Sequence, residues 1–438
     1  MTNKTNNKDA AQLVIPRADH CISRSNISKA ALKVLYRLKD GGYQAYLVGG
    51  SVRDLLLGGR PKDFDVATDA TPEEVRALFN NSRVIGRRFR LVHVRFGREV
   101  IEVATFRAPA NHDEDDHAIA EGSGRVLRDN VWGTFEDDVW RRDFTANGLY
   151  YNINDFSIRD YVDGVADIEK RQLRLIGDPE QRYREDPVRM LRAARFAAKL
   201  NFNLAESTAA PIPELAELLN NIPPARLFDE FGKLFQSGNA RKAWLQLKEL
   251  KLAEQLFPWT MKWLADDPDG RRNRFVETAL QNTDDRVHAD KPVTPMFLFA
   301  VLLWGPVREG ADMLVERKQM SDVQALIAAA AEMAAVQVTK ISVPKRFTFP
   351  MREIMQMQSR FENRRGKRVG STLEHRRFRA AYDLMLLRQE LGEVDEETAR
   401  FWTDIQKGSD QEHQSSKRSS GNGKRRGGPR RRRRNTPQ

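Results

Sequence analysis

GGSVRD at residues 49–54 and KDFDVAT at residues 62–68 are the most informative segments of this sequence. The apolar run before Gly49 predicts a strand that ends in Gly49-Gly50, and Val52–Leu57 predicts a helix after it. Glycines at such a turn let backbone amides approach a ligand closely, and the start of the helix adds a partial positive charge. The first segment therefore predicts a phosphate-binding turn that uses Gly49, Gly50, Ser51 and Arg53.

The second segment predicts a strand with two carboxylates on one face. Side chains alternate along a strand, so Asp63 and Asp65 share a face while Phe64 points into the core. Two adjacent carboxylates repel each other unless they share cations, and phosphoryl transfer by two Mg²⁺ ions requires this arrangement. The alternative is that Gly49-Gly50 is only a tight turn and that Asp63 and Asp65 mark a solvated strand face. The two segments in this order favour the catalytic interpretation.

A sheet domain surrounds these segments. A polar leader, residues 1–26, precedes a helix expected over 27–38, and a second helical pattern at 73–79 begins with a cap residue and a proline. Short β-like runs follow one another from Gln44 to Tyr161, broken by Gly, Pro and Asp. The clearest runs are 44–50, 64–68, 82–86, 91–96 and 99–107.

After Ile176 helical patterns replace strands. We expect helical segments at 188–200, 224–237, 241–257, 322–336 and 372–391. From Lys407 the composition changes to Ser, Gly, Gln and Arg, which cannot bury enough apolar area to fold alone. The sequence thus predicts an α+β protein: an N-terminal sheet domain, an all-α neck and body, and a disordered basic tail.

The charge is concentrated in this tail. The net charge is +12, and Lys417–Arg434 contains ten basic residues and no acidic ones, so the rest of the chain is near +2. The single cysteine, Cys21, excludes an internal disulfide framework. The first residues lack the apolar core of a secretory signal, and no apolar run reaches the ~20 residues of a membrane helix. These features predict a soluble, cytoplasmic protein.

A third acidic residue is expected to join Asp63 and Asp65, and two candidates remain open. Glu102 lies in the otherwise apolar strand 99–107, where a buried, unpaired carboxylate would be costly and would need a cation. Asp143 follows a helix-capping pattern at 134–137, and on a helix it would share a face with Asn147. In that case Asp143 and Asn147 could hold a ribose while Arg142 meets phosphate. A solvated helix end with an internal salt bridge is the alternative.

The helix at 188–200 begins with a further polar pattern. Asp186 precedes Pro187 and can act as the N-cap. Arg189, Arg192 and Arg195 recur on one flank of this helix, while its apolar residues turn towards the core. A carboxylate and a guanidinium can also imitate the edge of a complementary base, so Asp186 and Arg189 are candidates for base recognition.

Taken together, these motifs resemble those of a known enzyme family. GGSVRD, KDFDVATDATPEEV, IEVATFR, RRDFTANGL and REDPVRMLRAARF, spread over residues 44–200, are similar to class II nucleotidyltransferases of the polymerase β superfamily, which include bacterial poly(A) polymerases and CCA-adding tRNA nucleotidyltransferases. The resemblance implies a nucleotidyltransferase sheet domain, Mg²⁺ and helical neck, body and tail regions. It implies Asp63 and Asp65 as metal ligands and Glu102 as the later-strand carboxylate. By the same resemblance, the motif that binds ribose and triphosphate is matched by Arg142, Asp143 and Asn147. The base-reading motif is matched by Asp186 and Arg189, and Arg192 lies on the same flank of the helix as Arg189.

Three features favour the poly(A) polymerase subgroup. These are IGRRFRLVHV at 85–94, the leader IPRADHCISR at 15–24 and the arginine tail. The tail can hold RNA through phosphate contacts that do not depend on sequence. Its candidate RNA-binding residues are Arg425, Arg426, Arg430, Arg431, Arg432, Arg433 and Arg434. Nonspecific charge or docking to another RNA-binding protein are alternative roles for the tail.

The resulting hypothesis is template-independent transfer of AMP from ATP to RNA 3′ ends, with two Mg²⁺ ions. A CCA-adding enzyme and a catalytically inactive RNA-binding protein are the alternatives. The resemblance implies coupling to RNA decay machinery and to an Sm-like RNA chaperone. We expect a leader at 1–26, a catalytic domain at 27–176, a neck that binds RNA and nucleotide at 177–260, a C-terminal helical domain at 261–406 and the tail at 407–438. HDEDDH at 112–117 resembles a metal cluster, but its Gly- and Asp-rich surroundings favour a solvated loop.

Overall fold

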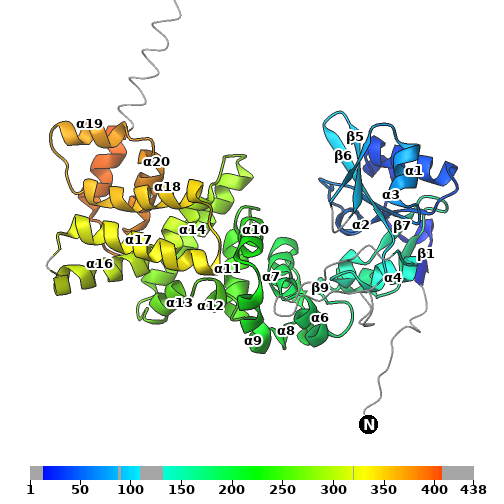
Figure 1. The fold of residues 1–438 in the computed structure, drawn as a ribbon, viewed down its shortest axis with the longest axis horizontal. Helices are drawn as coiled ribbons and strands as arrows, with labels where there is room; N and C mark the ends of the chain where they lie inside the picture. The colour runs from blue at the N-terminus through cyan, green and yellow to red at the C-terminus, as the bar shows by residue number, and fades with distance from the viewer. Residues whose placement is uncertain (1–12, 87–89, 109–131, 319, 407–438) are drawn as a thin grey trace, which may run out of the picture. The chain divides into compact units, whose positions relative to one another are not determined.

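The computed structural model of the protein describes residues 13–86, 90–108, 132–318 and 320–406 (Figure 1). The chain divides into two compact units. The first extends to Met261 and includes Leu280–Val293 and Val336–Val343, and the second contains Lys262–Ala279, Thr294–Ala335 and the residues from Pro344 onward. Strands dominate the beginning of the first unit and helices the remainder, so the α+β prediction is confirmed. Among the helices that the structure describes, none combines the length and the hydropathy that a membrane span requires.

A mixed sheet forms the core of the N-terminal part. Within the described residues its strands follow the order β1-β8-β7-β2-β3-β6-β5-β4. They are β1 (Leu13–Ile15), β2 (Ala45–Val48), β3 (Asp65–Thr68), β4 (Ser82–Ile85), β5 (Leu91–Phe96), β6 (Glu99–Thr105), β7 (Tyr150–Asn152) and β8 (Ile158–Asp160). All five predicted runs form strands. The short strands β1, β7 and β8 were not predicted, because three residues show too little alternation to be recognised.

Helices α1 (Lys29–Asp40) and α3 (Pro72–Leu78) pack against β6 and neighbouring strands. The Ser28 hydroxyl caps α1 by accepting the Ala31 amide, and Thr71 and Glu74 form a reciprocal capping box at α3. Helix α2 (Gly50–Leu56) begins directly after β2. The order strand, glycine turn, helix at Gly49-Gly50 is therefore confirmed.

Aromatic side chains cover part of the sheet where α4 (Phe135–Trp140) packs. Phe135 of α4 lies 4.8 Å from Tyr46 and 4.6 Å from Tyr150 between ring centroids, and 5.7 Å from Phe106. Tyr150 and Phe106 are fully buried. This cluster fixes α4 to the sheet and so positions the segment that follows α4.

Helices make up the remainder of the first unit. The described elements are α5 (Gly164–Glu169), α6 (Pro179–Glu185), α7 (Val188–Leu200), α8 (Glu206–Ala209), α9 (Ile212–Leu215), α10 (Pro224–Phe235), α11 (Ala240–Glu249) and α12 (Ala253–Leu256), with a small sheet of β9 (Gln172–Leu173) and β10 (Asn203–Leu204). Helix α7 has the predicted bounds and packs against α11. The single segment expected at 241–257 is wrong, because the chain breaks between α11 and α12, where Lys251 adopts a left-handed φ of 55°.

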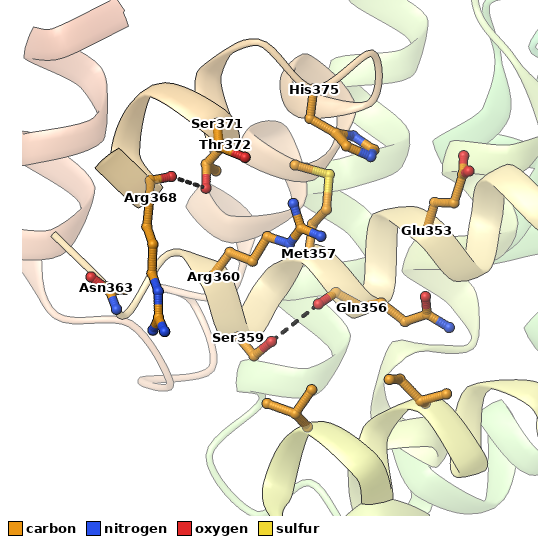
Figure 2. A pocket seen from close by; sticks show the side chains of 12 residues that line it. Glu353, Gln356, Met357, Ser359, Arg360, Asn363, Arg368, Ser371, Thr372 and His375 are labelled. Atoms are coloured by element: carbon orange, nitrogen blue, oxygen red, sulfur yellow. Dashed lines mark hydrogen bonds between the residues drawn. The ribbon is translucent and has the colours of Figure 1, made fainter. Parts of the chain in front are cut away.

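The described residues of the second unit contain helices and no strand. Helices α13 (Pro258–Ala265), α14 (Arg271–His288) and α17 (Asp322–Lys340) are each divided between the two units. The helices that lie wholly in the second unit are α15 (Pro295–Leu302), α16 (Trp304–Lys318), α18 (Lys345–Gln356), α19 (Lys367–Leu373) and α20 (Phe378–Leu387). The segment expected at 372–391 is two helices, α19 and α20. A cleft lies among α17, α18, the 3₁₀ turn η6 (Met357–Arg360) and α19 (Figure 2).

Gly164, the first residue of α5, lies where the structure leaves no space for a side chain. A Cβ atom at Gly164 would lie 2.3 Å from the backbone oxygen of Thr145, which cannot move aside as a side chain could. We expect Gly164→Ala to destabilise the protein by about 2–3 kcal/mol, measured by thermal unfolding.

Gly232→Ala is the matched control. Gly232 lies inside α10, and its Cβ would come no closer than 3.4 Å to the flexible end of Gln236. This change should be neutral or stabilising by about 0.5–1 kcal/mol. Equal unfolding temperatures for the two variants would contradict the close approach of α5 to Thr145.

Candidate active site

A row of polar residues crosses one face of the sheet. Asp65 of β3 lies directly opposite Glu102 of the parallel strand β6, and Glu102 lies opposite His93 of β5. Residues in direct register share a face, so these side chains are neighbours. The His93 Nε2 atom is 3.2 Å from a Glu102 carboxylate oxygen. Of the two candidates for the third acid, Glu102 therefore lies beside Asp65.

Asp63 lies just before β3, and the predicted alternation holds at this point. Asp63 and Asp65 are exposed while Phe64 between them is buried. Glu102 is also exposed, with 49 % of its side chain accessible. The cost of a buried, unpaired carboxylate therefore does not apply to Glu102, because its side chain is open to solvent and has His93 as a partner.

The charged form of Asp65 is electrostatically unfavourable in this site. Loss of surrounding water and the nearby charge of Glu102 raise the pKa of Asp65 to about 6, and Asp63 adds to this while Arg142 opposes it. A cation bound here would relieve the repulsion. No group of three His, Cys, Asp or Glu side chains in the described part of the chain forms a ready-made metal site. Mg²⁺ commonly uses only one or two carboxylates and takes its remaining ligands from water and phosphate, so the residues present fit this ion.

The glycine turn lies at the end of β2, next to β3. Gly49 has φ 70°, in the left-handed region that favours glycine, and a Cβ there would lie 3.3 Å from an Nη atom of Arg142. Ser51 and Arg53 are buried, with exposures of 3 % and 2 %. The Ser51 hydroxyl donates to the Val48 carbonyl at 2.9 Å. The side chains of Ser51 and Arg53 are therefore not free to reach a triphosphate, contrary to their predicted direct role.

Arg142 is held in place by two neighbours. Its Nε donates to the Tyr150 hydroxyl at 2.6 Å, and its Nη2 donates to Asp138 at 3.0 Å. Burial opposes ionisation of Asp138, but the charge of Arg142 and the Tyr150 hydrogen bond outweigh it and lower the pKa of Asp138. Tyr150 in turn lies in register with Val48, which is opposite Asp65. The guanidinium is thus fixed near both the glycine turn and the carboxylates.

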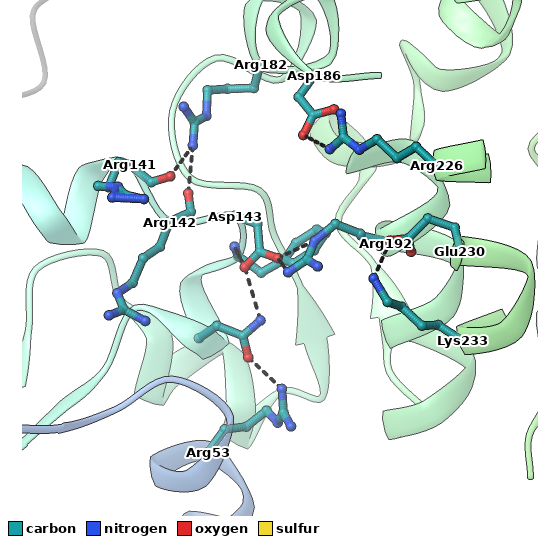
Figure 3. Close-up of polar contacts among 12 residues, drawn as sticks. Arg53, Arg141, Arg142, Asp143, Arg182, Asp186, Arg192, Arg226, Glu230 and Lys233 are labelled. Carbon is teal, nitrogen blue, oxygen red and sulfur yellow. Dashed lines mark hydrogen bonds and ion pairs between the residues drawn. The ribbon is translucent and has the colours of Figure 1, made fainter. Parts of the chain in front are cut away.

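Asp143 lies in a chain of polar contacts that extends from Arg53 to Arg192 (Figure 3), and Asn147 connects Arg53 to Asp143 within it. Arg53 Nη1 donates to Asn147 Oδ1 at 2.5 Å, Asn147 Nδ2 donates to Asp143 Oδ1 at 3.1 Å, and Asp143 Oδ2 accepts two hydrogen bonds from Arg192 of α7. The expected helix is wrong: α4 ends at Trp140, and Asn147 lies in a 3₁₀ turn, η4 (Thr145–Asn147). The two residues still meet, because the turn brings them together.

This chain changes the predicted roles of Asp143 and Arg192. Burial opposes ionisation of Asp143, yet the Arg192 charge and the surrounding hydrogen bonds lower its pKa. Both carboxylate oxygens of Asp143 already accept hydrogen bonds. Asp143 therefore joins the sheet domain to α7 in this structure, and Arg192 is its partner.

The start of α7 is polar, as expected, but Asp186 is not its formal N-cap. Pro187 takes that position, while Asp186 accepts the Val188 amide at 3.3 Å and pairs with Arg226 of α10 at 2.8 Å (Figure 3). Arg189 donates to the Arg182 carbonyl at 2.7 Å and to Glu185 at 3.0 Å. Both side chains lie at the junction of α6 and α7.

Two lysines near this site were not predicted. Burial lowers the pKa of Lys199 at the end of α7, and nearby Arg53, Arg195 and Lys62 lower it further. Lys62 directly precedes Asp63, which is the only sequence signal for it. Positive charge is therefore concentrated close to Lys62, next to the start of β3. The tail arginines 425–434 and the HDEDDH segment 112–117 lie outside the described residues.

Comparison with known proteins identifies the family. Residues 45–174 match the Poly A polymerase head domain, residues 201–264 the probable RNA and SrmB-binding site of polymerase A, and residues 318–438 the polymerase A arginine-rich C-terminus. The chain is 48 % identical to Poly(A) polymerase I of Salmonella typhimurium over 91 % of this chain and 87 % of that protein. It is 50 % identical to Poly(A) polymerase I of Escherichia coli O6:H1 over 86 % of this chain and 82 % of that protein.

The chain belongs to the bacterial poly(A) polymerase family. It is an enzyme, a nucleotidyltransferase, and the resemblance of its motifs is confirmed. A CCA-adding enzyme of Lactobacillus helveticus is 38 % identical over 52 % of this chain and 54 % of its own. The fold is shared with a tRNA nucleotidyltransferase solved with a primer tRNA and an incoming ATP analogue, at 20 % identity, a TM-score of 0.53 and coverage of 86 % and 99 % of the two chains.

The raised pKa of Asp65 predicts a pH-dependent instability of the metal-free enzyme. Asp65 is uncharged in the folded protein below about pH 6, whereas in the unfolded chain it ionises near its ordinary value of 3.8. Stability is therefore lost as the pH rises through this window. Asp65→Asn should be more stable than the parent at pH 7.5 in EDTA. Because Asp65 contacts solvent, the gain is limited to about 1 kcal/mol.

Thermal unfolding at pH 7.5 and pH 4.5 measures this effect. The difference between parent and variant should be smaller at pH 4.5, which lies near the lower end of this window, and should also shrink when Mg²⁺ is added at pH 7.5. A variant less stable than the parent at pH 7.5 without metal would show that Asp65 is not under electrostatic strain.

Proposed function

We propose that the protein adds AMP from ATP to the 3′ hydroxyl of RNA without a template and releases pyrophosphate. The observation that carries this proposal is the placement of Asp65 beside Glu102, next to the Gly49-Gly50 turn. The identity of 45–50 % to several poly(A) polymerases over most of the chain supports adenylate as the transferred group. We assign residues 27–176 to the catalytic domain, 177–260 to the neck that binds nucleotide and RNA, and 261–406 to a C-terminal helical domain.

Asp63 and Asp65 would hold Mg²⁺, with Glu102 as the additional carboxylate. Bound Mg²⁺ supplies Lewis-acid activation of the attacking hydroxyl and neutralises charge on the triphosphate. Glu102 is preferred over Asp143, because Asp143 is committed to Arg192 and Asn147. The exposed face of Asp65 and Glu102 leaves them accessible to the ion.

The protein's own groups would bind and orient the nucleotide. Gly49 and Gly50 allow the triphosphate to approach the backbone, and Arg142 beside them provides a fixed positive charge. Arg53, Asn147, Asp143 and Arg192 act as positioning residues that hold α2, η4 and α7 in a fixed relation. Asp186 and Arg189 at the start of α7 would read the base edge, and on nucleotide binding they would exchange their present contacts with Arg226 and Glu185 for the base.

The biological setting is also part of this proposal. We infer that the protein acts in the cytoplasm on many RNA 3′ ends, that the added tails promote RNA decay, and that decay machinery and an Sm-like RNA chaperone are partners. The tail arginines would hold RNA through phosphate contacts that are independent of sequence.

A substrate comparison tests the proposed activity against both alternatives. The enzyme is incubated with labelled ATP or CTP and with either an unstructured oligonucleotide or a tRNA that lacks its 3′ end. We expect ATP-dependent extension of both RNAs by many residues and little use of CTP. Addition that stops after CCA on the tRNA alone would identify a CCA-adding enzyme, and no incorporation would identify an inactive RNA-binding protein.

Arg189 should control nucleotide choice more than RNA affinity. A base-edge contact contributes about 1–3 kcal/mol, so Arg189→Ala should reduce discrimination between ATP and CTP by roughly tenfold or more. The measurement is kcat/KM for each nucleotide. Arg184→Ala is the matched control, since Arg184 pairs with Glu180 on exposed α6 and lies outside the proposed base site. Identical ratios for the parent and both variants would remove Arg189 from base recognition.

A further inference from the structure

The cleft of the second unit has the size of a ligand site. It has a volume of about 490 Å³ and lies among α17, α18, η6 and α19 (Figure 2). Ligand pockets commonly measure about 300–1,000 Å³. None of the residues proposed for catalysis lines it, so the active site does not account for it.

Positive charge dominates one side of the cleft. Arg360 of η6 and Arg368 of α19 are exposed, and neither has an ion-pair partner among the described residues. Glu353, the one acidic residue in the lining, is already paired with Arg376 at 2.5 Å and Arg377 at 3.0 Å. The two unpaired guanidinium groups are therefore available to an anion.

An apolar surface forms another part of the lining. Val323 and Ile327 lie one turn apart on α17 and are 48 % and 40 % exposed, which is unusual for such side chains. The buried side chain of Met357 adds a further apolar contribution. Asn363 and Gln356 add polar groups (Figure 2). The cleft thus offers unpaired cations and an aliphatic surface within one hollow.

We propose that this cleft binds one nucleotide unit of an RNA strand, with its phosphate on Arg360 and Arg368 and its base against Val323 and Ile327. A nucleotide presents an anion and a flat apolar face within a few ångströms, which matches the two kinds of lining. An aliphatic surface contacts any base, so the subsite would not select sequence. The inference rests on the proposed function, since RNA is the polymer that this enzyme would extend.

Direct RNA binding to the full-length protein tests the subsite without requiring catalysis. The parent and Arg360→Ala/Arg368→Ala are titrated with a fluorescent oligoadenylate over a series of salt concentrations. Each lost phosphate contact lowers the slope of log K against log salt by roughly 0.7 for a single strand. The two arginines share one phosphate, so the slope of the double variant should become shallower by about 0.7.

Arg379→Ala/Arg400→Ala is the matched control. It removes the same charge from the second unit, but Arg379 and Arg400 are paired with Asp383 and Glu396 on exposed helix surfaces. Its slope should equal that of the parent. An equal loss of slope in both double variants would overturn the proposal and leave only general electrostatic attraction.

Ile327→Ser tests the apolar contact separately. We expect it to weaken oligoadenylate binding about threefold while the salt slope stays unchanged, because no charge is removed. Amide hydrogen exchange should show protection of residues 353–375 by the oligonucleotide in the parent and its loss in Arg360→Ala/Arg368→Ala.

Competition identifies other occupants. If polyglutamate does not displace RNA from the parent and binds Arg360→Ala/Arg368→Ala as well as it binds the parent, the result supports a nucleotide site. If this variant loses polyglutamate binding while its RNA binding is unchanged, the proposal is overturned in favour of an acidic protein segment. A parent enzyme that binds oligoadenylate through these arginines but incorporates no AMP would contradict the proposed function and leave the subsite supported.

Discussion

The parallel register of β3 and β6 is the constraint on which the site depends. It places Asp65 directly beside Glu102, with Asp63 just before the same strand. Like charges at this spacing oppose each other, which is visible in the raised pKa of Asp65. The folded protein tolerates this repulsion because hydrophobic packing of the sheet, α1 and α3 sets the register. A bound cation would turn the same arrangement from an unfavourable contact into a set of metal ligands, as we propose.

A second constraint connects the sheet to the helix that would read the nucleotide. Asp143 accepts hydrogen bonds from Asn147 and Arg192, and Asn147 accepts one from Arg53 of α2. Breaking such a partly buried pair by removing one partner leaves an uncompensated charge and is strongly destabilising. The glycine turn and the start of α7 are therefore connected through side-chain hydrogen bonds. These bonds fix the proposed triphosphate contacts relative to the proposed base contacts.

Local pattern was enough to predict much of this arrangement. The alternation around Phe64, the Gly49-Gly50 turn and the bounds of α7 all follow from interactions between near neighbours in the sequence. The partners of the charged groups could not be predicted in this way. Arg53 meets Asn147 and Arg192 meets Asp143 only after distant segments pack together, so residues expected to touch the nucleotide are engaged with each other. The break between α11 and α12 depends on the left-handed backbone conformation of Lys251, which a lysine in the sequence does not predict.

The role of Asp65 as a metal ligand can be measured by single-turnover addition of AMP to an oligoadenylate with the Asp65→Asn variant. The substitution keeps the size of the side chain and removes the charge that a cation requires. With saturating ATP, RNA and Mg²⁺, the rate should fall at least a thousandfold, about 4 kcal/mol of transition-state stabilisation, while RNA affinity changes little. A folded variant that retains a tenth of the parent rate would contradict the assignment of the Asp65 and Glu102 face as the catalytic centre.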